Sequence, residues 1–352
     1  MSVATIDTVQ LLKDLIAIPS LSKDEGRTAD LIIKTLEERG VQTHRHLNNV
    51  WAVNKFYNPD KPTLLLNSHH DTVKPNAVYT LDPFTPIEKD GKLYGLGSND
   101  AGGALVSLIA TFIHFYEKEN LKYNLVLAAT AEEEISGKNG VECILDKLPT
   151  IDFAIVGEPT LMDLAIAEKG LMVIDCVAKG VGGHAAREEG DNAIYKAMKD
   201  IEWFRNYQFD KVSDTLGAMK MSVTVINAGS QHNVVPAECA FTVDIRITDA
   251  YTHEEVLDII DRHTLSEITP RSMRLKSSGI AVDHPIVQAG LALGRKTYGS
   301  PTMSDQALIP VPSLKIGPGD SARSHTADEF IFVDELKEGV RLYIEMLEKV
   351  VF

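Results

Sequence analysis

Cysteine is scarce in this sequence, and long apolar runs are absent. The three cysteines, Cys143, Cys176 and Cys239, are far apart and odd in number, which argues against both a disulfide framework and a Cys-rich zinc site. No apolar run approaches the roughly 20 residues that a membrane-spanning helix needs. The first 20 residues lack a basic flank and an unbroken apolar core, so no signal peptide is expected. Together these absences predict a cytoplasmic protein without a membrane partner.

Positive charge is also in short supply. The 352 residues include 35 Lys and Arg against 50 Asp and Glu, a formal net charge of −15. Such a surface does not attract nucleic acid or an anionic membrane, which argues against both as partners. The hydrophobic fraction of 44% is that of a globular chain. Because single cores stop growing beyond about 250–300 residues, the length predicts about two domains.

The first half of the chain alternates short apolar strands with helices. Apolar runs that fit strands buried on both faces occur at residues 64–66, 125–128 and 153–156. Residues 104–115 carry apolar side chains at helical spacing, and an amphipathic helix is expected before Pro19. This alternation predicts an α/β sheet with its functional residues at the carboxyl ends of the strands.

The pattern changes near Leu171 and returns near Asp283. Between them the expected order is β-α-β-β-α-β, the ferredoxin-like pattern of a compact α+β unit. Its strands are expected at residues 171–178, 219–226, 239–247 and 271–276, and its helices at 192–204 and 254–263. A helix at 286–296, a strand at 313–316 and a helix at 333–349 follow. The sequence therefore predicts an inserted domain, residues 170–281, that interrupts a first domain made of residues 1–169 and 282–352.

The segment after the strand at 64–66 contains two histidines and an aspartate. Residues two apart in an extended chain point the same way, so His69 and Asp71 share a side and His70 faces away. A carboxylate beside a ligating imidazole fixes its tautomer and raises its basicity. His69 is therefore a candidate metal ligand and Asp71 its orienting partner, with a plain polar loop as the alternative.

Four further segments carry carboxylates or a histidine at the ends of predicted strands or in loops. They are the glycine-rich loop 95–103 with Asp100, the triplet Glu132–Glu134, the segment 157–160 with Glu158, and the segment 324–329 with His325. Each alone also fits a helix cap or a charged turn. Three adjacent carboxylates, however, repel one another unless a cation or a proton intervenes. The joint occurrence of these segments predicts a metal centre at one edge of the sheet.

In their order along the chain these motifs resemble those of a known family. His69-x-Asp71, Asp100 after Gly-x-Gly, Glu133-Glu134, Gly-Glu158-Pro and His325 are similar to the motif set of the dinuclear zinc deacylases and exopeptidases. That family includes acetylornithine deacetylase, succinyl-diaminopimelate desuccinylase and glutamate carboxypeptidases. The resemblance covers essentially the whole chain. It implies an α/β, zinc-exopeptidase-like catalytic domain with a mixed sheet, and an inserted ferredoxin-like domain that serves as a lid and forms a homodimer.

The resemblance also implies a set of metal ligands. His69 and Glu158 would hold one zinc ion, Glu134 and His325 the other, and Asp100 would bridge them, with cobalt as a possible substitute. Three carboxylates and two neutral imidazoles carry −3 against +4 for two Zn²⁺, so a bridging hydroxide would bring the site to zero. The family further implies a cis peptide bond between Asp100 and Ala101.

A base, an oxyanion-binding group and substrate contacts follow from the same resemblance. Glu133 would be the general base, with Asp71 assisting through His69, and His184 would stabilise the oxyanion from the partner subunit. The candidate substrate-binding residues are Asn233, Arg246, Asp305 and Gly319. Arg246 suits a carboxylate because its planar fork binds one bidentately. An ordinary exposed strand residue is the alternative for Arg246, and a loop histidine is the alternative for His184.

The implied function is hydrolysis of the amide bond of an N-acyl amino acid, with acetylornithine or acyl-citrulline of arginine biosynthesis as the leading substrates. A succinyl-diaminopimelate desuccinylase would share every metal ligand, and a dipeptidase or aminopeptidase of the same family is a third enzyme hypothesis. A non-catalytic scaffold is the alternative of a different class, and the intact base and ligands argue against it. The acyl group, the amino-acid side chain and the physiological metal stay open at this point.

Overall fold

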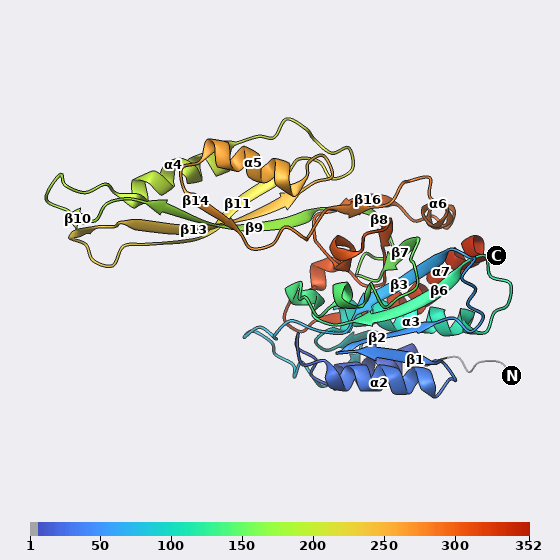
Figure 1. Ribbon diagram of the computed structural model, residues 1–352. Helices are drawn as coiled ribbons and strands as arrows, with labels where there is room; N and C mark the ends of the chain where they lie inside the picture. Colours follow the sequence, from blue (N-terminus) through green and yellow to red (C-terminus); the bar gives the residue numbers. More distant parts are fainter. Residues whose placement is uncertain (1–5) are drawn as a thin grey trace. The chain divides into compact units, whose positions relative to one another are not determined.

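The computed structural model describes residues 6–352, which form two compact units (Figure 1). The first unit comprises the described residues through Ile166 together with Gly279–Tyr298 and Ser304–Phe352. The second comprises Ala167–Ser278 and the short segment Gly299–Met303, which the sequence pattern had placed with the first. Between residues 6 and 352, no helix is both long and apolar enough to cross a membrane.

A mixed sheet forms the centre of the first unit. Seven of its strands lie in the order β1-β2-β6-β3-β7-β17-β8. Their bounds are β1 (Thr43–His46), β2 (Asn49–Val53), β3 (Thr63–His69), β6 (Asn124–Thr130), β7 (Phe153–Val156), β8 (Leu164–Glu168) and β17 (Ser313–Lys315). Strands β6, β3, β7 and β17 run parallel, whereas β2 and β8 pair antiparallel with their neighbours. The four parallel strands therefore present their carboxyl ends at one edge of the sheet.

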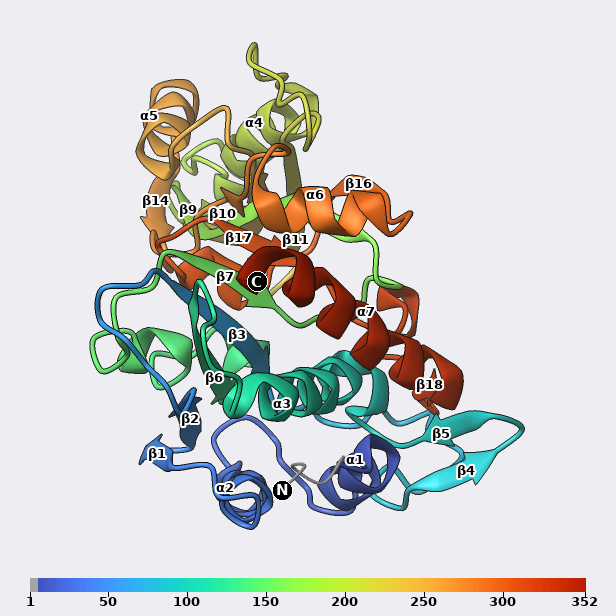
Figure 2. The ribbon, with the colours of Figure 1, turned by 90° about the vertical axis from the view of Figure 1, so that its right-hand side faces the viewer.

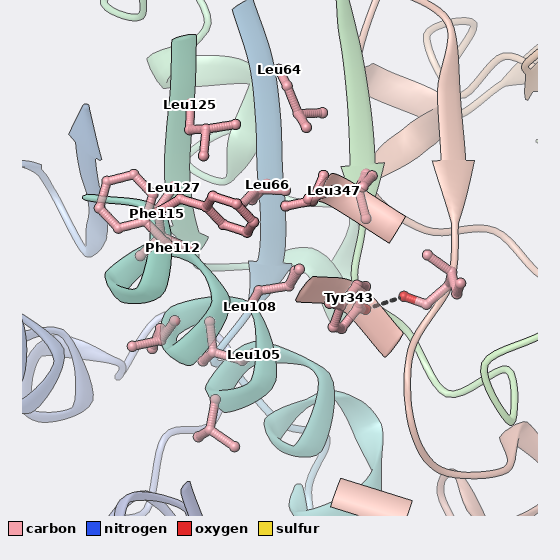
Figure 3. Close-up of a cluster of buried hydrophobic side chains, with 14 of the residues drawn as sticks. Leu64, Leu66, Leu105, Leu108, Phe112, Phe115, Leu125, Leu127, Tyr343 and Leu347 are labelled. Carbon is pink, nitrogen blue, oxygen red and sulfur yellow. Dashed lines mark hydrogen bonds between the residues drawn. The ribbon is translucent and has the colours of Figure 1, made fainter. Parts of the chain in front are cut away.

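The two faces of this sheet bury different cores, because successive side chains on a strand point to opposite faces. Leu64 and Leu66 of β3 belong to the larger core, while Leu65 belongs to a smaller one. Figure 3 shows Leu64 and Leu66 among side chains of the larger core, which include Phe112 and Tyr343. The Tyr343 hydroxyl satisfies its polarity by donating a hydrogen bond to the Ile316 carbonyl. Burial on both faces explains the continuous apolar runs of the central strands.

The helices of the first unit are α1 (Thr8–Ile16), α2 (Gly26–Glu37), α3 (Gly103–Tyr116), α6 (Pro285–Ala292) and α7 (Val333–Val351). In Figure 2, α7 lies along α3, and α3 packs against β3 and β6. Every residue of α3 except His114 is buried, which explains why this helix is apolar on all sides. The Asp7 side chain caps α1 by accepting from the backbone N–H of Gln10.

A small antiparallel sheet, β18-β5-β4, joins two distant parts of the first unit. It consists of β4 (Ile87–Lys89), β5 (Lys92–Tyr94) and β18 (Phe330–Phe332). The chain leaves β5 through the irregular turn η1 (Ser98–Gly102) into α3, and it enters β18 just after His325. The pairing of β5 with β18 thus brings the loop of Asp100 beside the loop of His325.

The second unit is a four-stranded antiparallel sheet with two helices. Its strands, in the order β11-β13-β9-β14, are β11 (Lys220–Ala228), β13 (Glu238–Ile247), β9 (Gly170–Lys179) and β14 (Glu267–Pro270). The helices are α4 (Ala193–Asn206) and α5 (His253–His263). A two-stranded ribbon pairs β10 (Gly183–His184) with β12 (Val234–Val235). The order β9-α4-β11-β13-α5-β14 is the expected ferredoxin-like one.

The remaining short elements are two strands and four 3₁₀ turns. They are β15 (Ser278–Gly279), β16 (Thr297–Ser300), η2 (Glu133–Ile135), η3 (Val141–Ile144), η4 (Asp305–Leu308) and η5 (Ser321–Arg323).

Three local predictions were wrong or incomplete. The last strand of the second unit is β14 and not residues 271–276, because Ile268 pairs with Cys176 and packs against the core there. The helix expected at 286–296 ends at Ala292, since Gly294 adopts a φ of +79°, the left-handed conformation that terminates helices. The pattern also missed α2, which buries Ile32 and Leu36.

Candidate metal centre

The carboxyl edge of the parallel strands gathers most of the expected ligands. His69 is the last residue of β3, Glu133 and Glu134 form the turn η2 just after β6, and Glu158 follows β7 by two residues. Because β6, β3 and β7 are neighbouring parallel strands, these side chains converge without any long loop.

Three carboxylates surround the Nε2 atom of His69. The distances from Nε2 are 3.4 Å to Asp100 Oδ1, 3.7 Å to Glu158 Oε1 and 3.9 Å to Glu133 Oε2. This nitrogen is buried and has no hydrogen-bond partner. A buried nitrogen aimed at three carboxylate oxygens without bonding to them is what a metal-ligating imidazole requires.

Asp100 faces both histidines of the centre. Its Oδ1 atom is the one near His69, and its Oδ2 atom lies 3.6 Å from His325 Nε2. His325 Nε2 also lies 2.9 Å from Glu134 Oε2. Asp100 thus stands between two donor groups, one around His69 and one around His325. The peptide bond between Asp100 and Ala101 is cis, as the resemblance implied.

Asp71 supports the centre from behind. Its carboxylate lies 3.3 Å from His69 Nδ1, and its backbone oxygen lies 2.9 Å from the same atom. Its two carboxylate oxygens also accept hydrogen bonds from the backbone N–H groups of Glu133 and Glu134, at 3.0 and 3.2 Å, and from the Ser22 hydroxyl at 2.7 Å. One buried carboxylate therefore orients a ligand and fixes the turn that carries two further acidic groups.

Glu132 holds the other end of this turn. It is buried and has a left-handed backbone with φ of +54°. Its N–H donates to Glu25 Oε1 at 3.2 Å, and its own carboxylate accepts from the Asn139 side chain at 3.0 Å. No role was predicted for Glu132, and the structure shows that it anchors the loop that follows Glu133 and Glu134.

The crowded carboxylates raise one another's pKa values. Burial, followed by the charges of Glu158, Asp305 and Glu134, outweighs the nearby His69 and holds the Glu133 pKa well above its ordinary value. Glu158 behaves in the same way, chiefly through its burial. Burial lowers the pKa of His69, but the surrounding carboxylates reverse this and keep it well above 6.5. A proton or a bound cation at this centre is therefore favoured over the fully ionised, empty cluster.

This donor set fits a pair of divalent metal ions. Two overlapping groups of side chains could hold an ion, His69 with Asp100 and Glu134, and His69 with Glu133 and Glu158. Because both groups use His69, a second ion needs a further donor, and His325 lies 2.9 Å from Glu134. Mixed imidazole and carboxylate donors suit zinc, and also cobalt or manganese. Positive charge at this point would relieve the repulsion among the carboxylates and satisfy the free Nε2 atom of His69.

Two of the predicted substrate-binding residues lie in the first unit. Asp305 is buried, and its carboxylate accepts a hydrogen bond from Thr130 Oγ1 at 2.7 Å; its burial raises its pKa to about 6. Gly319 has a φ of +91°, and a Cβ there would lie 2.5 Å from Asn99 Oδ1, so a side chain is excluded. The neighbouring N–H groups of Gly317 and Asp320 are already bonded within the protein.

The other predicted residues lie in the second unit. His184 is exposed on β10, and its Nδ1 atom accepts a hydrogen bond from the backbone N–H of Ala186 at 3.1 Å. Asn233 is exposed, and its carbonyl accepts from the N–H of Ala185. Arg246 on β13 is half-buried and forms two hydrogen bonds with Asp244, at 2.8 and 3.1 Å.

Sequence reasoning missed two residues that hold the centre together, Glu329 and Asn99. Glu329 is buried, and its Oε1 atom accepts from the backbone N–H groups of Asn99 and Asp100. The Asn99 side chain exchanges two hydrogen bonds with the backbone of Asp320, both at 3.0 Å. Both residues lie inside segments that the sequence singled out, 95–103 and 324–329, but no role was predicted for them.

The fold and this site define a metal-dependent α/β enzyme. A model of peptidase family M20/M25/M40 matches residues 65–349, and the chain belongs to this family of metal-dependent hydrolases. The family acts on small acyl amino acid or peptide substrates. Acetylornithine deacetylase is not singled out among its members by this match.

Named relatives agree with this assignment. The chain is 29% identical over 275 residues to succinyl-diaminopimelate desuccinylase 2 of Ruegeria sp., a match that covers 74% of this chain and 70% of that protein. A dinuclear metal-binding M20 peptidase of Bacillus subtilis shares the fold with a TM-score of 0.75 at 19% identity, covering 98% of this chain and 97% of that one. The aminopeptidase PepT of Bacillus cereus does so with a TM-score of 0.79 at 17% identity, covering 99% and 100%.

Proposed function

We propose that this protein is an N-acyl-amino-acid amidohydrolase that removes the acyl group from acetylornithine or an acyl-citrulline. The observation that carries the hydrolytic part is the position of Asp100, with one carboxylate oxygen toward His69 and the other toward His325. A carboxylate placed in this way can be shared by two metal ions, which is the arrangement that amide hydrolysis at a two-metal site needs.

In this proposal the chain's own side chains hold the metals. His69 and Glu158 would hold one metal ion, Glu134 and His325 would hold the other, and Asp100 would be their shared ligand. When bound, the pair would lower the pKa of a water molecule and polarise the scissile carbonyl. Asp71 keeps the His69 imidazole in the tautomer that leaves Nε2 free for the ion.

Glu133 acts as the general base. Its carboxylate lies 3.9 Å from His69 Nε2 and belongs to the same group of side chains as Glu158, so it faces the place where the attacking water would lie. It receives a proton from the attacking water and passes it to the leaving amine, so one group serves both half-steps. Its backbone is fixed by Asp71, which keeps the carboxylate aimed into the site.

His184 supplies the oxyanion contact. Because its Nδ1 atom accepts from a backbone N–H, the neutral ring carries its proton on Nε2, where it is available as a donor. We propose that this donor serves the site of the partner subunit in a homodimer formed through the second unit. Arg246 and Asn233 would bind the substrate carboxylate, with Arg246 sharing its guanidinium with Asp244.

Succinyl-diaminopimelate desuccinylase activity is the second candidate, and the curated relative of that name favours it. The two activities differ in the acyl group and the amino-acid side chain, and not in the metal chemistry.

A substrate panel separates the candidates. The protein is loaded with zinc or cobalt, and kcat/KM is measured for acetyl- and succinyl-ornithine, acetyl- and succinyl-citrulline, succinyl-diaminopimelate and a dipeptide. The proposal expects the highest kcat/KM for an acylated ornithine or citrulline. A preference for succinyl-diaminopimelate or the dipeptide would replace it, and no turnover of any of them by a metal-loaded protein would refute an amidohydrolase of this substrate class.

A further inference from the structure

Glu329 links the two loops that carry Asp100 and His325. It directly precedes β18, whose first residue, Phe330, pairs with Tyr94 at the end of β5. Its carbonyl continues this ladder by accepting from the N–H of Gly95 at 3.0 Å. The chain therefore holds Glu329 by its backbone at the start of the loop that leads to Asp100.

The side chain of Glu329 is hydrogen-bonded to the backbone of the loop that leads to Asp100. Its Oε1 atom accepts from the N–H of Asn99 at 2.8 Å and from the N–H of Asp100 at 3.0 Å, and the carboxylate also accepts from the N–H of Gly97. Glu329 is only 2% exposed. A buried carboxylate that accepts three amides of one loop, those of Gly97, Asn99 and Asp100, fixes the loop far more firmly than a single bond would.

The same loop is also hydrogen-bonded to the segment before His325. The Asn99 amide bonds to both backbone groups of Asp320, and Gly319 makes the close approach possible because a Cβ would collide with Asn99. The two loops are thus joined by two sets of hydrogen bonds, those of the Glu329 carboxylate and those of the Asn99 side chain. Both sets of bonds act on the loop at Asp100 or just before it.

We propose that Glu329 is a positioning residue that sets Asp100 in the orientation needed to bridge the two metal ions. This inference rests on the proposed function, because it concerns the same metal pair. Glu329 belongs to neither group of side chains that could hold an ion, and its Oε1 atom accepts two backbone amides, so it is not assigned as a ligand. Its effect passes through the main chain of Asp100.

The test compares Glu329→Gln and Glu329→Ala with the parent protein by titrating metal-free samples with Co²⁺. The readouts are the affinity for each ion and the visible and paramagnetic resonance spectra, since coupling between two Co²⁺ ions reports a shared bridge. Glutamine keeps one acceptor oxygen but turns an NH₂ group toward the loop, whereas alanine removes all three bonds. We expect about tenfold weaker binding in the first and about a hundredfold in the second, with reduced coupling in both.

Asp328→Asn is the matched control. Asp328 adjoins Glu329 and also accepts two backbone N–H groups, those of Thr80 and Leu81, but it does not contact the loop of Asp100. Its variant should keep the parent's metal affinities and spectra. A purely structural role for Glu329 would lower the melting temperature and leave the spectrum of the loaded protein unchanged.

The outcomes separate the two proposals. A parent that binds no Co²⁺ overturns both. A parent that binds two coupled ions, with both variants retaining its affinity and coupling, overturns only the role of Glu329. If Glu329→Ala does not fold, Glu329→Gln decides, because its side chain has nearly the same shape.

Discussion

The chain holds its candidate functional residues very differently in its two units. In the first, the side chains of His69 and Asp71 are 1% and 0% exposed and are fixed by neighbouring strands and backbone amides. In the second, His184 is exposed on a two-stranded ribbon and Asn233 is exposed just before the ribbon's second strand. The first unit therefore preorganises its groups before any ligand arrives, whereas the candidate groups of the second unit are exposed and held by few neighbours.

The second unit also exposes apolar side chains and an open strand edge. Strand β11 lies at the edge of its sheet, with Val225 and Ile226 48% and 53% exposed. On α4, Tyr195 and Met198 are also exposed. An open edge strand with apolar side chains invites pairing with another chain, and this supports the proposed homodimer.

The largest expected effect lies in the preorganised unit. Replacing the proposed base, Glu133→Gln, should lower kcat by roughly 10²–10⁴-fold while leaving two metal ions bound. The measurements are steady-state kinetics on the best substrate of the panel and the metal content of the purified protein. Glu119→Gln, at an exposed glutamate of the same unit, is the control. Near-parental kcat in Glu133→Gln would remove Glu133 from the mechanism.

The second prediction concerns the exposed group. His184→Ala should lower kcat by roughly 10²-fold or more, as loss of an oxyanion donor does. If His184 serves the partner's site, co-expression with Glu133→Gln creates mixed dimers with one intact site and restores about a quarter of the parent's activity. Arg187→Ala, at an exposed neighbour, should be silent. No restoration in verified mixed dimers would place His184 on its own subunit's site or outside catalysis.

The third prediction tests the open edge directly. Two lysines, Val225→Lys and Ile226→Lys, should weaken self-association by roughly a hundredfold, because unpaired charges would be buried in the interface. Analytical ultracentrifugation over a range of concentrations measures the effect. Leu265→Lys, at an 82% exposed leucine elsewhere in this unit, controls for added charge. An unchanged dimer would assign association to another surface, and a parent that is already monomeric would refute the homodimer.

Residues at the ends of buried strands could be predicted from the sequence, whereas residues held by distant partners could not. The ends of buried strands were visible as apolar runs followed by His69, Glu133 and Glu158, and parallel pairing then brings them together without further information. Glu329 was less visible, because its partners lie 229 and 230 residues away and become neighbours only through β5 and β18. Periodicity does not specify such a contact.

Local errors have a similar origin. The strand at Glu267–Pro270 is short, and its place is decided by pairing with β9 more than by its own composition. Asp305 was predicted to bind substrate without any indication of its surroundings, and it is buried against Thr130 at the end of β6. Its contact with substrate stays a prediction. In both cases the deciding interaction is with a strand distant in sequence.

The smallest predicted effect tests how far the first unit's order depends on its own buried polar groups. His70 faces away from the centre, with Nε2 2.9 Å from the Asn48 carbonyl and Nδ1 2.8 Å from Thr28 Oγ1, and its burial lowers its pKa to about 4. An unfolded histidine titrates near 6.5, so the unfolded chain takes up the proton first as the pH falls. The stability that His70 contributes is therefore complete above pH 6.5 and is lost progressively toward pH 4. Between pH 7 and pH 5 the loss is about 2 kcal/mol.

Urea unfolding of the metal-free protein at pH 7 and pH 5 measures this loss without a contribution from metal release. In His70→Gln the difference in unfolding free energy between the two pH values should be about 2 kcal/mol smaller than in the parent. His46→Gln is the control, because His46 lies in the same region on the outer strand β1 and is not fully buried. Equal pH dependence in the parent and His70→Gln would show that the buried imidazole is not held neutral. The preorganisation of the first unit would then rest on its carboxylates and strand pairing alone.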